Sequence, residues 1–198
     1  MRRKNKIGIL CCLMLVLGSV STWAQWSYGV RVGANFSTYK SKPLDPKFAV
    51  GPHLGGFVTY AVNAVFGIQG ELLYSMQGCR YEVGLNPDET VMFRRRTHNL
   101  NLPVLARFQF GRNFHFLLGP QFGFLLGAQE KGVEGGYVRM SATRPFDFGL
   151  LGSFGYAFNE HLEVDIRYVH GFLPVFDYYG DDYKILNRNL QLSLGYRF

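Results

Sequence analysis

Acid–base and nucleophilic side chains are the first places to look for chemistry, and in this chain they do not converge. A hydrolase needs a nucleophile held beside a general base, yet His98 and His170 fall in separate segments and no serine accompanies either of them. His53, His115 and His161 lack the spacing of metal ligands, and the glycine pairs lack the lysine of a phosphate-binding loop. We therefore expect no catalytic site, no cofactor and no metal ion.

Eight charged residues form a second group, and they occupy the polar positions of alternating segments. They are Arg31, Arg107, Arg167, Arg197, Glu71, Asp147, Glu163 and Asp165. Equal numbers of opposite charges are close to a requirement inside a narrow closed barrel, because an unpaired buried charge costs several kcal/mol. We expect all eight residues to belong to a polar network in the lumen. Within it, Glu71, Arg107, Glu163, Asp165 and Arg167 are expected to form structural salt bridges, with proton relay or catalysis as the alternative.

The segments that carry these charges alternate between apolar and polar residues, which is the period of a β-strand. No stretch keeps a helical period for three turns. Eight strands are predicted, at residues 26–37, 50–62, 65–78, 96–110, 114–127, 145–158, 162–172 and 186–198. Soluble sandwiches usually have strands of about five or six residues, so these strands are long.

Short and long connections alternate between the predicted strands. The short ones, 63–64, 111–113 and 159–161, consist of turn-forming residues. The long ones are residues 38–49, 79–95, 128–144 and 173–185. This order is typical of an up-and-down meander with one end at the periplasm and the other outside, and eight strands put both termini at the short-turn end.

Bulky apolar residues occupy one face of each predicted strand, and polar residues occupy the other. The division is least clear in the second strand. Charge is almost absent from the middle of the apolar face, so that face suits lipid and the polar face suits a lumen. Aromatic residues near both strand ends resemble two interfacial girdles. The sequence therefore predicts an all-β fold, an eight-stranded antiparallel up-and-down transmembrane β-barrel with a lumen filled by side chains.

Pro103 is the feature that opposes this scheme. Proline cannot donate a hydrogen bond to a sheet, and a closed barrel has no edge where it could sit without cost. We expect a local β-bulge at Pro103, which would shift the alternation on one side of that strand.

The first 24 residues predict a cleaved secretory signal peptide, with the basic start MRRKNK, an apolar stretch at 7–20, and small residues before the cut. Residues 25–198 are then one outer-membrane β-barrel domain. Removing the four cations of the basic start lowers the formal net charge from +7 to +3. Cys79 is left without a second cysteine, so no intramolecular disulfide is expected.

Arg94, Arg95 and Arg96 form a basic run where the second long loop enters the fourth predicted strand, and Arg188 is expected at a similar height. An exported chain does not meet nucleic acid, so we expect no nucleic-acid partner. These four guanidinium groups could contact phosphates of outer-leaflet lipid head groups. A solvated loop end is the equal alternative.

Taken in order, several segments resemble the PorT-type outer-membrane β-barrel family of Bacteroidetes: GVRVGANFS, ELLYSMQG, LNLPVLARF, LLGPQFGFLL, DFGLLGSFGYAF, LEVDIRY and NLQLSLGYRF. The resemblance covers residues 26–198, and the family usually has a proline where Pro103 lies. It implies an integral outer-membrane location and an eight-stranded barrel. The family is functionally mixed, and one branch serves type IX protein secretion.

We expect a structural or adaptor role in the cell envelope, performed by the loops. The expected partners are outer-membrane lipids, the barrel-assembly machinery during biogenesis, and an envelope or secretion-system protein. Three alternatives stay open. They are a PorT-like component of type IX secretion, a small-solute porin, and, least favoured, an outer-leaflet lipid enzyme that uses His98 and His170.

The closing segment NLQLSLGYRF is an alternating strand, and its Tyr196 and Phe198 look like the C-terminal signal that barrel-assembly machinery recognises. Deleting Phe198 should therefore impair assembly more than any loop substitution does. The measurement is the amount of folded, heat-modifiable protein in outer membranes. Normal membrane insertion of the truncated chain would refute the assignment.

Overall fold

A computed structural model describes residues 26–40, 47–86, 89–131, 138–139, 145–174 and 186–198, so the predicted signal peptide lies outside the described residues. Nine strands follow one another along the chain. They are β1 (Trp26–Lys40), β2 (Lys47–Ala61), β3 (Phe66–Asn86), β4 (Glu89–Phe110), β5 (Phe114–Lys131), β6 (Val138–Arg139), β7 (Phe146–Ala157), β8 (Leu162–Pro174) and β9 (Leu186–Arg197). No helix in these ranges is long and apolar enough to cross a membrane.

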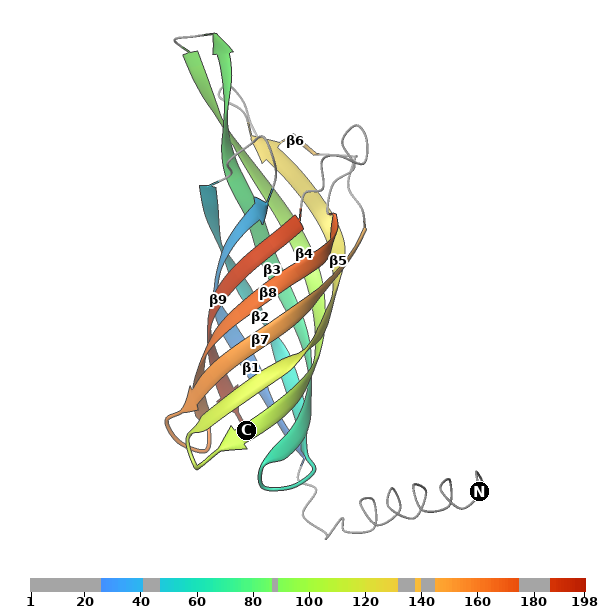
Figure 1. Cartoon of the computed structure of the whole chain (residues 1–198), viewed down its shortest axis with the longest axis vertical. Helices are drawn as coiled ribbons and strands as arrows, with labels where there is room; N and C mark the ends of the chain where they lie inside the picture. The colour runs from blue at the N-terminus through green and yellow to red at the C-terminus, as the bar shows by residue number, and fades with distance from the viewer. Residues whose placement is uncertain (1–25, 41–46, 87–88, 132–137, 140–144, 175–185) are drawn as a thin grey trace, which may run out of the picture.

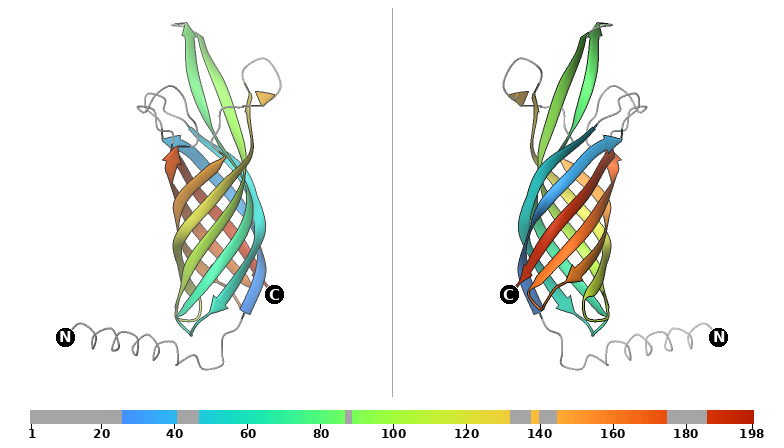
Figure 2. Two further views of the ribbon diagram at one scale, coloured as in Figure 1. Left: turned by 90° about the vertical axis from the view of Figure 1, so that its right-hand side faces the viewer. Right: turned by 90° about the vertical axis from the view of Figure 1, so that its left-hand side faces the viewer.

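Eight of the strands close into a ring, which confirms the predicted barrel (Figure 1). Each strand pairs antiparallel with its neighbour, β1 pairs with β9, and the pairing of β4 with β5 completes the circle. The two-residue β6 pairs only with the far end of β5, outside the ring. Both ends of the described chain lie at the end of the barrel with the short turns, called here the turn end (Figure 2).

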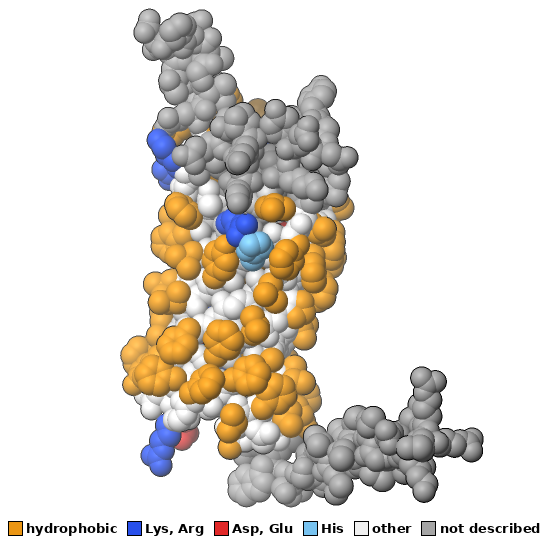
Figure 3. All heavy atoms as spheres, viewed as in Figure 1, with side chains coloured by type: hydrophobic (Ala, Val, Ile, Leu, Met, Phe, Trp, Pro, Cys, Tyr) orange, Lys and Arg blue, Asp and Glu red, His pale blue; other side chains and the backbone are white. Residues whose placement is uncertain are grey.

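Side chains alternate between the inside and the outside of this ring, as the sequence predicts. A continuous apolar belt covers the outside (Figure 3). The belt includes Tyr28, Val30, Val32, Leu54, Val58, Ile68, Leu72, Val104, Leu118, Phe124, Leu150, Phe154, Ile166, Tyr168, Leu190, Leu192, Leu194 and Tyr196. Because a soluble sheet would bury such a face against a second layer, the belt requires an apolar surrounding.

Apolar side chains also point into the ring, at positions between the polar ones, and four of them pack together. Leu105, Leu117, Leu151 and Val169 are almost fully buried and form one cluster contributed by four neighbouring strands, β4, β5, β7 and β8. This apolar cluster fills one wall of the lumen, and the charged side chains pair with one another beside it.

The prediction that residues 79–95 form a loop is wrong. Instead of ending, β3 and β4 continue past the barrel as a two-stranded ribbon, paired in register as far as Asn86 and Glu89 (Figures 1 and 2). The sequence reading missed it because strands were identified by an apolar lipid face, and a ribbon outside the membrane needs no such face. The predicted loop 128–144 likewise contains the end of β5 and all of β6.

The bulge expected at Pro103 is also wrong. The register of β4 is the same on both sides of Pro103, against β3 and against β5. Leu102 and Pro103 have no pairing partner on β3, and β4 pairs with β3 on both sides of them. A missing N–H group thus interrupts the ladder without shifting it, and the register shift of β4 against β5 falls between His98 and Asn99 instead.

Candidate functional site

The lumen is organised around the guanidinium group of Arg31, whose residue is only 1% exposed. Its Nη1 donates a short hydrogen bond to Asp165, and its Nη2 donates to Glu163 Oε1 at 2.8 Å. Its Nε lies 3.7 Å from Glu71 Oε1, and the guanidinium lies over the ring of Phe57 at 5.2 Å. One cation on β1 therefore joins acids of β3 and β8 across the barrel.

Glu163 is the most shared acid of the lumen. Besides Arg31, its carboxylate accepts hydrogen bonds at Oε2 from Arg107 Nη2 at 3.0 Å and from Arg197 Nη2 at 3.1 Å. Charge-assisted bonds of this kind are about twice as strong as neutral ones. The loss of this one carboxylate would remove an ionic partner from each of three guanidinium groups.

Glu71 forms the second anchor of the same network. Its Oε2 accepts a hydrogen bond from Arg167 Nη2 at 2.7 Å, and its Oε1 accepts one from the amide of Gln69 at 2.6 Å. Gln69 accepts in turn from Arg107 Nη1 at 3.0 Å. Seven of the eight predicted lumen charges are thus linked directly or through one amide, and they stand on five strands, β1, β3, β4, β8 and β9.

Asp147, the eighth, lies apart from the other seven. Its Oδ2 accepts from Asn187 Nδ2 at 3.3 Å, and no described cation forms an ion pair with it. Asp147 is only half-buried and sits near the outer end of β7, beyond the arginines. Asp147 thus hydrogen-bonds to an amide of the lumen rather than to the arginines, because alternation gives the face of a strand but not the height at which a side chain lies.

Two buried histidines belong to the lumen, although the sequence analysis considered them only as metal ligands. His115 Nε2 lies 3.0 Å from Asp165 Oδ1, and His53 lies between Asn35 Oδ1 at 3.1 Å and Ser193 Oγ at 2.8 Å. Their positions in the alternation, on the polar side of β5 and β2, were the signal that could have found them.

Gly155 makes the contact between His115 and Asp165 possible. A Cβ atom at this position would lie 2.1 Å from His115 Nε2 and 2.6 Å from Asp165 Oδ1. Both distances are far below van der Waals contact, so any side chain here would displace the pair. Glycine at this position is required by the network rather than by the backbone.

His115, Glu163 and Asp165 are close enough to resemble a metal site, since one ligand atom of each lies within 4.8 Å of the others. Both carboxylates are already bound by Arg31, and Glu163 also binds two further arginines. A divalent cation would have to displace these guanidinium groups and then lie among them. The donor set therefore does not fit a metal ion.

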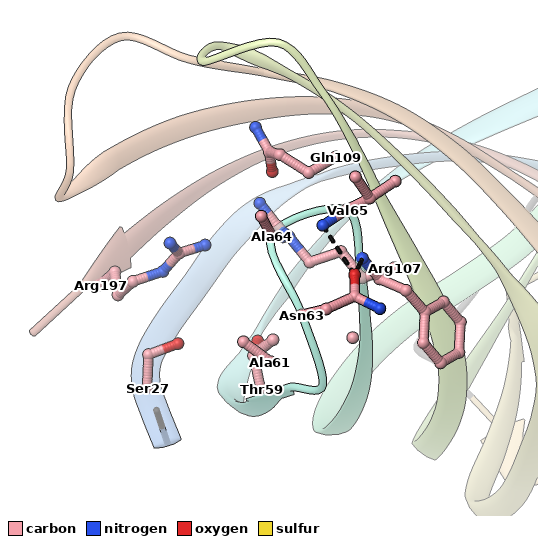
Figure 4. A pocket seen from close by; sticks show the side chains of 11 residues that line it. Ser27, Thr59, Ala61, Asn63, Ala64, Val65, Arg107, Gln109 and Arg197 are labelled. Atoms are coloured by element: carbon pink, nitrogen blue, oxygen red, sulfur yellow. Dashed lines mark hydrogen bonds between the residues drawn. The ribbon is translucent and has the colours of Figure 1, made fainter. Parts of the chain in front are cut away.

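At the turn end the lumen opens into a pocket of about 130 Å³ (Figure 4). Ser27, Thr59 and Gln109 line it together with Arg107 and Arg197. Beside it, the turn between β2 and β3 is held by Asn63, whose side-chain oxygen accepts from the N–H groups of two following residues at 2.9 and 2.7 Å. Arg107 and Arg197 also bind Glu163, so this mouth of the lumen is lined by two members of the charged network.

At the opposite end, Arg95 does not fit the predicted contact with lipid head groups. It is buried, its Nη2 lies 3.3 Å from Glu130 Oε2, and its guanidinium lies over the ring of Tyr81 at 5.6 Å. Tyr81 also donates a short hydrogen bond to Glu130 and stacks on Phe93. Arg95 thus belongs to a cluster that holds the base of the ribbon.

Arg94, Arg96 and Arg188 lie on the outward side of the strands. Arg188 Nη1 donates to the hydroxyl of Tyr168 at 2.9 Å and lies 2.7 Å from His170 Nδ1. His98 Nδ1 is 2.6 Å from another tyrosine hydroxyl. His98 and His170 stand on β4 and β8, three strands apart in the ring, so they do not converge on one site.

Tyr196 and Phe198 lie at the turn end, and both are exposed on the outside. The backbone N–H of Phe198 donates to the carbonyl of Tyr28 at 3.0 Å, and the rings of these two residues lie 5.7 Å apart. The last residue thus completes the seam between β1 and β9. Its role as an assembly signal stays a prediction.

Residues 21–177 match the family described as outer membrane protein beta-barrel domain. The chain belongs to this family. Among solved structures it is similar to Neisserial surface protein A, at 14% identity over 88% of this chain and 99% of that one, with a TM-score of 0.57. It is also similar to Ail, the attachment invasion locus protein of Yersinia pestis, at 17% identity, 88% and 99% coverage and a TM-score of 0.52. No curated protein matches the chain.

This outer-membrane barrel therefore faces lipid with its apolar belt, and its turn end is the periplasmic end. Its lumen holds charges in an environment where water cannot replace a missing partner, so each ion pair acts as a fixed crosslink between strands. The lumen of this barrel is therefore occupied by a polar network that links the strands rigidly.

Replacing Glu163 by Gln should destabilise the outer-membrane barrel by about 3–5 kcal/mol, because it removes the shared anion of three buried guanidinium groups. The measurement is equilibrium urea unfolding in phospholipid vesicles, followed by tryptophan fluorescence. The control is Glu160→Gln, an exposed acid on the nearby turn, which should change stability by less than about 0.5 kcal/mol. Equal stability of the two variants would rule out the central role of Glu163.

Replacing Gly155 by Ala should cost about 1–3 kcal/mol, because the added methyl group overlaps the pair formed by His115 and Asp165. The matched control is Gly152→Ala on the same strand, where the new Cβ would meet nothing nearer than 3.9 Å. The same unfolding assay distinguishes them, and a destabilisation no greater than that of the control would contradict the geometry.

Proposed function

We propose that this protein is a closed docking platform of the outer membrane, in which the barrel is an anchor and the ribbon of β3 and β4 binds another envelope protein. The observation that carries the proposal is the extension of these two strands beyond all their neighbours (Figure 2).

The lumen argues against solute conduction. Eight strands enclose a space that side chains just fill, and here the arginine network and the cluster around Leu105, Leu117 and Leu151 occupy it. The pocket at the turn end is lined by Arg107 and Arg197, which are held by Glu163. A porin role would require this network to come apart, which is costly for buried charges.

The ribbon offers what a protein-binding surface needs. The last residue pairs that tie it to the barrel are Lys47 with Arg80 on one side and Arg94 with Lys131 on the other. Beyond these pairs, the backbones of β3 and β4 pair only with each other in the part of the chain that the structure describes. Each strand therefore keeps one backbone edge open, and an extended segment of a partner can add to such an edge as a further strand.

The base of the ribbon is stiffened where it leaves the barrel. A two-stranded hairpin alone is marginally stable in water, but Arg95, Glu130 and Tyr81 form an ion pair, a hydrogen bond and a ring contact at this point. Stacking of Tyr81 on Phe93, with ring centres 5.5 Å apart, adds to it. The ribbon is thus presented to a partner in a fixed direction, which lowers the entropic cost of binding.

We further propose that the protein is not an enzyme. The outward histidines His98 and His170 are engaged by Tyr74 and Arg188, and they lie on strands three apart. A lipid enzyme would need a nucleophile beside one of them. Unchanged lipid profiles in cells carrying His98→Ala and His170→Ala would agree with this proposal, and altered profiles would overturn it.

A more specific form of the proposal makes this barrel a PorT-like component of type IX secretion in a Bacteroidetes species. Its support is the ordered resemblance of segments such as LNLPVLARF and DFGLLGSFGYAF to the PorT-type family. The test is deletion of the gene followed by an assay for export of proteins that bear the C-terminal signal of that system. Normal export would contradict this assignment without affecting the proposal that the ribbon docks a partner.

The docking proposal predicts that shortening the ribbon abolishes partner binding without unfolding the barrel. Residues 83–91 are replaced by Asn-Gly, a two-residue hairpin turn that joins the register partners Glu82 and Met92. A photo-crosslinking residue at Thr90 of the full-length ribbon should give a defined adduct in intact cells. The same residue at Arg112, on a periplasmic turn, should not give that adduct.

Protein identified in the adduct should co-purify with the full-length barrel and not with the shortened one. Both proteins should remain heat-modifiable, which shows that the barrel has formed. The absence of any adduct at Thr90, or equal co-purification with both proteins, would refute docking by the ribbon. Discrete current steps in a planar bilayer would refute the closed lumen independently.

A further inference from the structure

The charged network of the lumen contains more cations than anions. Its four arginines form ion pairs with only three carboxylates, those of Glu71, Glu163 and Asp165. The fourth acid, Asp147, lies apart and hydrogen-bonds to an amide. A buried charge without a counter-charge is costly, so the place of the excess positive charge indicates where an anion from outside the chain would bind.

The excess lies at the turn end of the barrel, on Arg107 and Arg197. Both guanidinium groups donate to the same oxygen of Glu163, Oε2, at 3.0 and 3.1 Å, and the other oxygen of this carboxylate accepts from Arg31. Among the described residues, Glu163 is the only acid with which Arg107 or Arg197 forms an ion pair, whereas Arg31 has two further carboxylate partners. Two cations at the periplasmic mouth therefore share one carboxylate oxygen.

These two arginines line the pocket of about 130 Å³ at the turn end, and Figure 4 shows them on opposite sides of it. This volume corresponds to about four water molecules at about 30 Å³ each, which is room for one small oxyanion. Ser27, Thr59 and Gln109 add hydroxyl and amide groups to the wall. The pocket therefore combines two cations with neutral groups that can donate hydrogen bonds.

Arg197 has donors left for such an anion. A guanidinium group carries five N–H donors, and among the described residues Arg197 uses only Nη2, in its bond to Glu163. Its Nε is buried without a hydrogen-bond partner in the same part of the chain. The side chain of Arg197 is 29% exposed, against 7% for Arg107 and 3% for Glu163. Arg197 is therefore the member of this cluster that a ligand from the periplasm can reach.

No acid in the described part of the chain supplies the missing charge. Glu160 is exposed on the nearby turn between β7 and β8, and neither it nor the carboxylate of Phe198 forms an ion pair with Arg107 or Arg197. The 25 residues before Trp26 contain no Asp or Glu. The counter-charge for this mouth would therefore come from another molecule.

We propose that the periplasmic mouth of the barrel is a carboxylate-binding site, in which Arg197 and Arg107 hold the ligand. A guanidinium group can bind a carboxylate through two parallel hydrogen bonds. The inference does not rest on the docking proposal, since the site lies at the opposite end of the barrel from the ribbon (Figure 1).

The charge of the network decides between the possible oxyanions. Four guanidinium groups and three carboxylates leave one positive charge. A carboxylate supplies one negative charge, whereas a phosphate monoester carries about −1.5 to −2 at pH 7. A carboxylate therefore neutralises the network without reversing its sign.

The test uses the full-length protein in dodecyl maltoside micelles, with its arginine side chains labelled with nitrogen-15. Acetate is titrated at constant ionic strength, with chloride as the reference anion, and the Nε–H resonances of Arg107 and Arg197 are followed by NMR. Both should shift in a saturable manner, with a dissociation constant in roughly the millimolar range expected for two charge-assisted hydrogen bonds. The resonance of Arg112, which is exposed on a turn at the same end, should not shift.

Two variants test the site in opposite ways, and both are read through the resonance of Arg107. Arg197→Gln should weaken acetate binding by about tenfold or more, because it removes the accessible guanidinium group. Gln109→Glu keeps every arginine and places a carboxylate of nearly the same shape in the pocket wall, at the cost of one exposed hydrogen bond to the carbonyl of Arg112. It should abolish acetate binding and raise the midpoint of urea unfolding, because it supplies the missing charge.

The matched control is Arg112→Gln, which removes an exposed cation at the same end of the barrel, outside the pocket. It should bind acetate like the wild type. All variants are compared only after heat-modifiable mobility shows a folded barrel. The blocked peptide acetyl-Gly-Gly-Asp-amide tests whether the carboxylate can be carried on a chain, and acetyl-Gly-Gly-Asn-amide is its uncharged counterpart. Binding of acetate alone would assign the site to free carboxylates, and binding of the Asp peptide as well would extend it to a peptide ligand.

Three outcomes would overturn the proposal. One is the absence of any saturable shift with acetate beyond that seen with chloride. Another is acetate binding that is unchanged in Arg197→Gln or in Gln109→Glu. The third concerns the chemical class of the ligand, because tighter binding of inorganic phosphate than of acetate would show that the site does not select a carboxylate. None of these results affects the docking proposal, which is tested at the ribbon.

Discussion

The buried carboxylate of Glu163 is the interaction on which the barrel depends. It binds guanidinium groups from β1, β4 and β9, and it stands on β8, so its partners come from opposite walls of the lumen. A buried charge without its partner costs several kcal/mol. These ion pairs are complete only when the ring is closed, and the network therefore favours the closed barrel over any open sheet of the same strands.

This constraint accounts for features that would otherwise look unrelated. Gly155 has no side chain because His115 and Asp165 occupy its space. The cluster around Leu117 fills the wall that the charged groups do not reach. Because the interior holds the strands together, the proposed docking uses a surface that the network leaves free, which is the ribbon.

The sequence predicted the closed barrel and most of the lumen, because alternation identifies the inner face of a strand without any knowledge of register. It placed Arg31, Glu71 and Glu163 on that face, and the structure joins them. It could not show height or register, which local patterns do not encode. Asp147 lies on the inner face but farther out than the arginines, and a bulge in β5 turns Glu130 inward to bury Arg95.

The base of the ribbon is where the barrel and the proposed binding surface meet. The last residue pairs that tie the ribbon to its neighbours are Lys47 with Arg80 and Arg94 with Lys131. A partner bound at the far end of the ribbon would exert leverage on this base. The ion pair of Arg95 with Glu130 and the hydrogen bond from Tyr81 to the same carboxylate join β3, β4 and β5 there, so they resist that leverage.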